Sequence, residues 1–534
     1  MKNYDPAIRE SAKFNELLNE VMEAQSHPQD SFEIAALLES MGWNDDRVSV
    51  EFGTFGVHDI FDLSDQMWDE AKSKIGYQTF SSTEKQNTTI LIISLIRSFL
   101  RGLIFAFPMA ISIFAMLSLK FSLWSYQYLS LEQATSIAIG TILSFVLVGG
   151  FTQAIARRGY FYIIQGYYDL ARRTTFLLIG IGFVTCFILS ILMIVLNFIF
   201  NMFSYDMLFL IVLYFFFLTA IWLSVTVMYI LKKEIVFTGL IIFGIFLVYV
   251  LFKLVGIDII ISQLISLCIV SVCSLFLVLF FFKVGERKND NEVAKLPRFS
   301  ITLYTVWPYF FYGFLYFSFL FIDRIIAWSK NEEFMPYLIW FRGQYELGLD
   351  FALLTIIIPM GVVEVVVNRL MFDLESSPKK YLAAESHKLY EKFIKMYKRM
   401  TVFILISTVV SSFVIYRVII WYNDMSIRLN NENILESEVT VFVLFWGIVS
   451  YSILAFCLMN VVILFALSQP ARVIKAFIPA LLTNIVIGFL LSRWFDYHFA
   501  VIGLFVGSLL LFYLTIKAVI DVLQNLDYYL YAAS

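Results

Sequence analysis

Long apolar runs separated by short polar segments fill the chain from about residue 97 onward. A helix needs about 20 apolar residues to cross the hydrocarbon core of a bilayer. Windows of this length predict about twelve spans in two blocks of six. The first block lies near 97–119, 134–155, 175–200, 207–231, 235–256 and 259–283, and the second near 301–322, 347–370, 401–421, 439–466, 473–491 and 499–522. We therefore expect an all-α polytopic membrane protein with two six-helix bundles.

The first 88 residues follow a different pattern. Apolar positions in KFNELLNEVMEAQ and SFEIAALLESMGW recur at the spacing of short amphipathic helices. This segment holds 17 acidic and 7 basic residues, an asymmetry that usually marks a separate region. The pattern predicts an acidic helical cytoplasmic domain (1–88), a first bundle (89–283), a cytoplasmic linker (284–300) and a second bundle (301–534).

Two basic loops occupy equivalent places in the two blocks. ARRGYFYIIQGYYDLARR follows the second span, and a longer segment with Lys379, Lys380, Lys392 and Lys395 follows the eighth. Corresponding features in two halves are typical of repeat-built transporters, whose site lies between the halves. Lys and Arg are roughly twofold more frequent on the side that receives these loops, which places both termini in the cytoplasm. We expect the loops to contact anionic lipids of the inner leaflet or to act as plain orientation signals.

Composition narrows the class of protein. With 60% hydrophobic and 15% charged residues, the chain is not expected to be a soluble globule. A formal net charge of −3 gives no nucleic-acid footprint. The four cysteines lie in apolar runs without metal-ligand spacing, so we predict neither a metal site nor a cofactor.

Charged residues interrupt the eighth span, FRGQYELGLDFALLTIIIPMGVVEVVVNR. On one helix Arg342, Glu346 and Asp350 would lie within about 80° of each other, and Glu364 would return to the bearing of Glu346. Ionisable groups inside a membrane segment are candidates for a substrate or ion pathway. The alternative is an ordinary i,i+4 pair between Arg342 and Glu346, with Asp350 merely at the interface.

The seventh span, YTVWPYFFYGFLYFSFLFIDRIIAW, is rich in aromatic residues and ends in Asp323 and Arg324. Adjacent residues do not face each other on a helix, so each needs another partner. We expect Arg342 to pair with Asp323, and Glu346 or Asp350 to pair with Arg324, forming an outer gate. Tyr and Trp rings could bind sugars, and two or three aromatic residues of this span are expected to line a path.

Other candidates lie at the inner end and inside the spans. Arg97 and Arg101, entering the first span, are expected either to reach the inner headgroups or to form a cationic inner vestibule. Pro108 and Pro359 are candidate hinges, because proline bends a helix.

The run FIDRIIAW followed by LDFALLTIIIPMGVVEVVV resembles the Pel exopolysaccharide transporter (PelG-like) family. Asp323, Arg324, Trp328, Pro359 and Glu364 match the pattern of that family, and the Phe107–Pro108 pair and the terminal LDYYLY are similar to its start and end. The acidic N-terminal extension departs from the pattern, and the usual Gly before the first-span Pro is absent. The resemblance implies the multidrug/oligosaccharidyl-lipid/polysaccharide (MOP) exporter superfamily, with two MATE-like bundles around a central cavity and alternating access.

The resemblance also implies export of a polysaccharide or lipid-linked sugar across the cytoplasmic membrane, rather than enzyme activity. Its expected partners are membrane lipids, the glycan substrate, and a cytosolic glycosyltransferase or other export components. The acidic groups would suit a cationic or hydroxyl-rich substrate or a coupling ion. Alternatives are a membrane-embedded glycan-modifying transferase and a non-transporting scaffold that recruits a cytosolic glycosyltransferase. No Walker motif is present, so any use of ATP would need another subunit.

Overall fold

The computed structural model describes residues 8, 11–24, 30–81, 88–288, 298–330, 337–376, 386–430, 433–526 and 528–529. Their contacts form two compact units. Unit 1 contains Met1–Arg97, Asn368–Lys398 and Leu523–Asp527, and unit 2 contains Ser98–Val367, Arg399–Val522 and Tyr528–Ser534. The central part of the predicted linker, 289–297, lies outside the described residues.

Unit 1 begins with four helices, α1 (Ala12–Ala24), α2 (Ser31–Ser40), α3 (Asp45–Phe52) and α4 (Ile60–Ser81). The Asp30 carboxylate accepts the backbone N–H of Glu33 at the start of α2, and the Asn44 side chain accepts that of Arg47 at the start of α3. These caps satisfy N–H groups that have no partner within the helix. A separate apolar core joins the four helices and includes Phe14, Leu18, Ile34, Leu38, Val48, Phe52, Leu63 and Met67.

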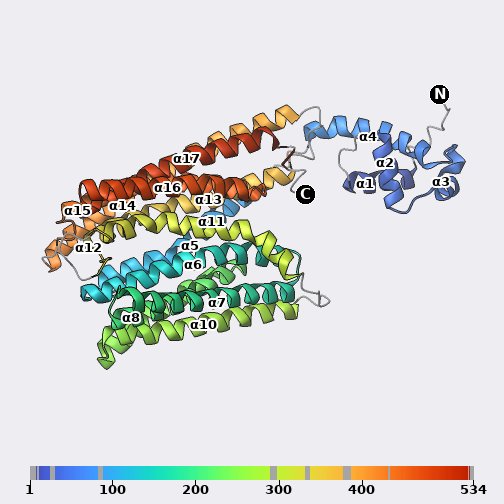
Figure 1. The fold of residues 1–534 in the computed structure, drawn as a ribbon. Helices are drawn as coiled ribbons and strands as arrows, with labels where there is room; N and C mark the ends of the chain where they lie inside the picture. The colour runs from blue at the N-terminus through green and yellow to red at the C-terminus, as the bar shows by residue number, and fades with distance from the viewer. Residues whose placement is uncertain are drawn as a thin grey trace. The chain divides into compact units, whose positions relative to one another are not determined.

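The long helices follow, and Figure 1 shows those that form unit 2 running side by side. They are α5 (Thr88–Leu119), α6 (Leu131–Ile164), α7 (Tyr168–Phe200), α8 (Tyr205–Ile230), α9 (Glu234–Tyr249), α10 (Ile259–Lys288), α11 (Phe299–Trp328), α12 (Gly343–Leu353), α13 (Ile357–Ser376), α14 (Ser386–Asn430), α15 (Glu438–Ala466), α16 (Pro470–Trp494) and α17 (Ala500–Gln524). Among the described residues, 11 helical stretches are long and apolar enough to cross a membrane, with Ala110–Leu119 of α5 as a shorter apolar segment. The all-helical membrane fold predicted from hydropathy is therefore confirmed.

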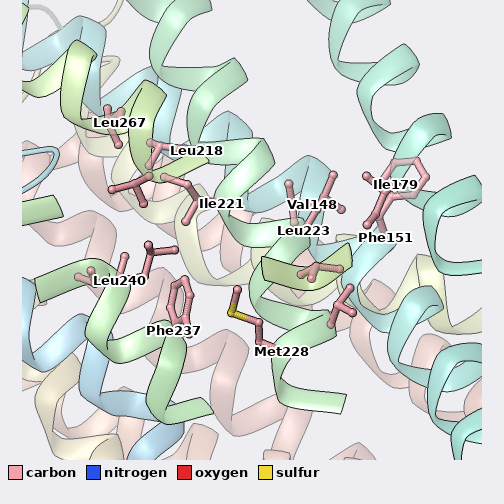
Figure 2. Close-up of a cluster of buried hydrophobic side chains, with 14 of the residues drawn as sticks. Val148, Phe151, Ile179, Leu218, Ile221, Leu223, Met228, Phe237, Leu240 and Leu267 are labelled. Carbon is pink, nitrogen blue, oxygen red and sulfur yellow. The ribbon is translucent and has the colours of Figure 1, made fainter. Parts of the chain in front are cut away.

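The first bundle, α5–α10, is held by a buried apolar core. Val148 and Phe151 of α6, Leu218 and Leu223 of α8 and Leu267 of α10 belong to it; Figure 2 shows part of this cluster. A Cβ on Gly140 would lie only 2.8 Å from the backbone oxygen of Ile211, so the absence of a side chain lets α6 approach α8 closely.

The second bundle, α11–α17, meets the first where α11 lies against α6. A Cβ on Gly313 of α11 would collide with the carbonyl oxygen of Gly149 on α6, so only glycine fits at this crossing. Two hydrogen bonds also join the bundles. Thr135 Oγ1 accepts the N–H of Phe341 at 3.1 Å, and the Tyr422 hydroxyl donates to the Leu117 carbonyl at 2.7 Å. We call this contact between the bundles the seam.

The eighth span is interrupted, and it contains Pro359. A 3-10 turn, Leu354–Ile356, separates α12 from α13. Proline has no N–H, so the Thr355 carbonyl four residues earlier lacks its α-helical donor. The buried Ser411 hydroxyl of α14 donates to that carbonyl at 2.7 Å. A side chain from a neighbouring helix therefore supplies the bond that the proline removes.

Ser411→Ala should destabilise the protein, because it leaves the buried Thr355 carbonyl without this donor, at a cost of about 1–3 kcal/mol. Ser407→Ala is the matched control, because the Ser407 hydroxyl donates at 2.9 Å to Ile404 within its own helix. Thermal unfolding of the purified variants in detergent should give a lower midpoint for Ser411→Ala than for the control. Equal midpoints would contradict this account of the break.

Candidate functional site

A cavity of about 1620 Å³ lies in unit 2, between the two bundles. Helices α5, α6, α8 and α9 of the first bundle and α11–α15 of the second contribute to its wall. Five residues that the sequence assigned to a pathway line it: Arg324, Trp328, Glu346, Asp350 and Glu364. Glu346, Asp350 and Glu364 of the eighth span thus face a shared cavity rather than lipid.

An ion-pair cluster lies on the cavity wall where α11 ends and α12 begins. The Arg324 guanidinium forms ion pairs with Glu346 and, at 3.2 Å, with Asp350. The Trp328 indole N–H donates to the other oxygen of Glu346 at 3.0 Å. The pairing of Arg324 with the two acidic residues of α12, suggested by the sequence, is present. We call Asp323, Arg324, Glu346 and Asp350 the charged cluster.

Burial differs across the charged cluster. The side chains of Arg324 and Glu346 are 7% and 8% exposed, whereas that of Asp350 is 47% exposed. A buried charge is tolerated when its partners replace lost water, as the contacts of Arg324 and Glu346 do. Asp350 is therefore the member of the cluster most accessible from the cavity.

The predicted pairing of Asp323 with Arg342 is wrong. Fully buried Asp323 instead accepts the Tyr345 hydroxyl at 2.8 Å. Arg342 donates to the Lys330 carbonyl at 2.8 Å, and its guanidinium lies 4.7 Å from the centroid of the Tyr497 ring. The reason is local, because Arg342 precedes α12 with a non-helical backbone, so its side chain does not share the helical face of Glu346. Neither Asp323 nor Arg342 lines the cavity.

The charged cluster has an excess of acidic groups. Three carboxyl groups, on Asp323, Glu346 and Asp350, surround the one guanidinium of Arg324. Charges of one sign held close together in a poorly hydrated site repel each other unless a counter-charge is present. A proton, a metal cation or a cationic group of a substrate could supply that charge at Asp350.

The remaining candidates are dispersed. Glu364 lies on α13, beyond the 3-10 turn, and lines the cavity, as does Pro108 of α5. Pro359 is buried beside the 3-10 turn but does not line the cavity. Arg97 is exposed and belongs to unit 1, and the side chain of Arg101 lies outside the described part of the structure. The inner vestibule of Arg97 and Arg101 thus stays a prediction.

Sequence reasoning missed the wall provided by the first bundle. Trp222, Thr226 and Tyr229 of α8 line the cavity, and their i, i+4, i+7 spacing puts them on one helical face. Thr141, Phe145 and Thr152 line the cavity from one face of α6. The signal was present as periodic polar and aromatic positions inside apolar runs, although no charge marked it. On α11, Tyr312, Tyr316, Phe317 and Phe321 line the cavity, whereas Trp307 and Phe314 are exposed on the outside.

Comparison with solved structures identifies the fold. The structure of the MATE transporter VcmN from Vibrio cholerae in its bent form has a TM-score of 0.54 at 15% identity, covering 83% of this chain and 99% of that one. The eukaryotic MATE transporter AtDTX14 gives 0.55 at 13% identity, covering 80% and 96%. A MOP superfamily transporter from Pyrococcus furiosus gives 0.53 at 13% identity, also covering 80% and 96%.

The chain therefore has the fold of MATE transporters of the MOP superfamily. No family model matches the sequence, and no curated protein matches it. The finer resemblance to the Pel exopolysaccharide transporters stays a prediction.

Arg324→Met should be strongly destabilising, because it leaves buried Glu346 without its cation, at a cost of about 3–5 kcal/mol. The double variant Arg324→Met/Glu346→Met should recover part of the loss, because it removes the buried charge together with its partner. Thermal unfolding of both variants measures the difference. A double variant less stable than Arg324→Met would contradict the pairing.

Proposed function

We propose that this protein is a membrane transporter that exports a polysaccharide or a lipid-linked sugar by alternating access between its two bundles. It would lie in the cytoplasmic membrane with both termini in the cytoplasm. The acidic N-terminal helices would bind a cytosolic glycosyltransferase or another export component.

The observation that carries the proposal is the cavity between the bundles, with five charged or polar pathway residues in its wall. A membrane segment retains buried ionisable groups at a cost, which function commonly explains. The fold supports transport, since the similar solved structures are those of transporters. A cavity of about 1620 Å³ also exceeds the volume of an ordinary small-molecule pocket, roughly 300–1,000 Å³, which favours a bulky substrate.

Alternating access requires the bundles to separate and rejoin. Such a motion would part the bundles at the seam, where the Gly149–Gly313 crossing and the hydrogen bonds of Thr135 and Tyr422 lie. The substrate assignment is supported by the aromatic and hydroxyl-bearing groups of the cavity wall and by the resemblance to polysaccharide exporters.

Neutralising the two acidic residues that pair with Arg324 should reduce export. In cells that make the polymer, Glu346→Gln and Asp350→Asn should each reduce secreted polymer by about tenfold or more. A tenfold decrease in the transport rate corresponds to a loss of about 1.4 kcal/mol of transition-state stabilisation. The polymer or its lipid-linked precursor should accumulate inside the cells. Asp258→Asn is the matched control, because Asp258 caps α10 with its side chain and does not line the cavity. Normal export with altered polymer chemistry would instead favour a transferase, and unchanged export would contradict the proposal.

A reversible crosslink across the seam tests the motion. Thr135→Cys/Phe341→Cys places two thiols at neighbouring positions across the seam, because Phe341 N and Thr135 Oγ1 are 3.1 Å apart, and mass spectrometry checks that they form a disulfide. The exposed Cys268 and half-buried Cys273 would first be replaced by serine. Oxidation should stop transport of a fluorescent lipid-linked oligosaccharide in proteoliposomes, and reduction should restore it. Undiminished transport by the crosslinked protein would rule out separation of the bundles at this end.

A further inference from the structure

A run of aromatic side chains crosses the cavity wall from one bundle to the other. The Trp124 and Trp222 ring centroids are 5.7 Å apart, and Trp222 lies 4.6 Å from Phe145. Phe145 of α6 then meets α11, with Phe321 at 5.4 Å and Phe317 at 5.7 Å. The run continues to the neighbouring rings of Tyr316 and Tyr312. All of these side chains line the cavity, and we call them the aromatic track.

Uncharged hydrogen-bonding groups flank the aromatic track. Thr141, Thr152 and Gln153 of α6 and Thr226 and Tyr229 of α8 line the cavity on the same helical faces as Phe145 and Trp222. Amide and hydroxyl groups both donate and accept hydrogen bonds. The hydroxyls of Thr141, Thr152 and Thr226 donate to carbonyls of their own helices, so they are left as acceptors for ligand hydroxyl groups, whereas the Gln153 amide can both donate and accept.

Charge is distributed unequally around the cavity. Among the described residues, the first bundle contributes Lys120 and Glu234 as charged lining residues, whereas the second contributes Arg324, Glu346, Asp350, Glu364 and Glu436. The aromatic track meets this charged side at Phe321, whose ring centroid lies 5.3 Å from the Arg324 guanidinium carbon. The aromatic track thus lies mainly on the side of the cavity with fewer charged residues and meets the more strongly charged side at the seam.

We infer that the aromatic track binds the neutral, hydroxyl-rich glycan part of the substrate. The charged cluster, at a separate place on the cavity wall, binds the counter-charge. This inference rests on the proposed function and assigns the substrate contact to the first bundle and the adjoining face of α11. Aromatic faces bury the C–H surface of sugar rings, and neighbouring amide and hydroxyl groups pair with the sugar hydroxyls.

The shape of the track favours a chain of sugars over a compact ligand. Several rings follow one another at 4.6–6.0 Å, so the track forms an extended strip along which successive sugar units can contact aromatic side chains. The flanking residues Thr141, Thr152, Gln153, Thr226 and Tyr229 are uncharged, and the charged lining residues described in the first bundle are Lys120 and Glu234, one of each sign. Because Phe145 contacts Phe317 and Phe321 only while the bundles are together, separation of the seam would divide the track and weaken its hold on the glycan.

The test measures binding to the full chain in nanodiscs, without glycoside detergents. The probes are neutral hexasaccharides of a hexose and of an N-acetylhexosamine, titrated to about 10 mM, and tetraphenylphosphonium as an organic cation. Trp222→Leu and Tyr316→Leu should each weaken hexasaccharide binding about tenfold. Gln153→Leu should weaken hexasaccharide binding without changing the binding of tetraphenylphosphonium. Trp307→Leu, on the outside of α11 and 53% exposed, is the matched control and should bind like the unchanged protein.

Each outcome decides the inference. Absence of hexasaccharide binding, equal binding by Trp222→Leu, Tyr316→Leu and Trp307→Leu, or track-dependent binding of tetraphenylphosphonium alone would overturn it. Transport of a labelled lipid-linked oligosaccharide in proteoliposomes keeps the two proposals apart. If the track variants transport normally, the aromatic track is not the glycan site, although the proposed transport function still holds. If the protein binds hexasaccharides but transports nothing, the proposed function is wrong, although the glycan site still holds.

Discussion

The pairing of Arg324 with Glu346 and Asp350 is the interaction on which the site depends. A guanidinium near the end of a membrane helix is stable only with partners that replace its lost water. Here the partners come from α12, the next helix in the chain, so the pairing fixes how α11 and α12 meet. The indole N–H of Trp328 holds Glu346 from the other side. The same contacts that stabilise this corner of the second bundle also present Asp350 to the cavity.

The seam lies beside this ion-paired corner and brings the first bundle to the same cavity. Glycines at the α6–α11 crossing bring the two backbones together, whereas the side chains elsewhere along the two helices leave room for the cavity. The interrupted eighth span also contributes to the cavity wall. The 3-10 turn divides it into α12, which carries Glu346 and Asp350, and α13, which carries Glu364. A cavity between two helical bundles, with ionisable groups in its wall, is the arrangement that alternating access requires.

Hydropathy predicted most of the fold because the bilayer imposes it. Backbone groups in lipid must be paired within a helix, so apolar length alone locates spans. It also identified Arg324, Glu346 and Asp350, since charges stand out in apolar runs. It failed at Arg342, where the helix begins one residue later, and at Asp323, whose partner Tyr345 carries no charge. Trp222 and Phe145 were missed because their role depends on neighbours from other helices, which one sequence does not specify.

The central claim is that Asp350 of the charged cluster faces a water-accessible space between the bundles. The most direct measurement is the reaction rate of a thiol at position 350 with a membrane-impermeant reagent, using Asp350→Cys in a background without Cys268 and Cys273. Phe314→Cys, on the outside of the same bundle and 39% exposed, reports the rate at a position that faces the bilayer. The account predicts rapid labelling at position 350, slowed by a bound glycan, and little labelling at position 314. Equal, slow labelling at both positions would contradict it.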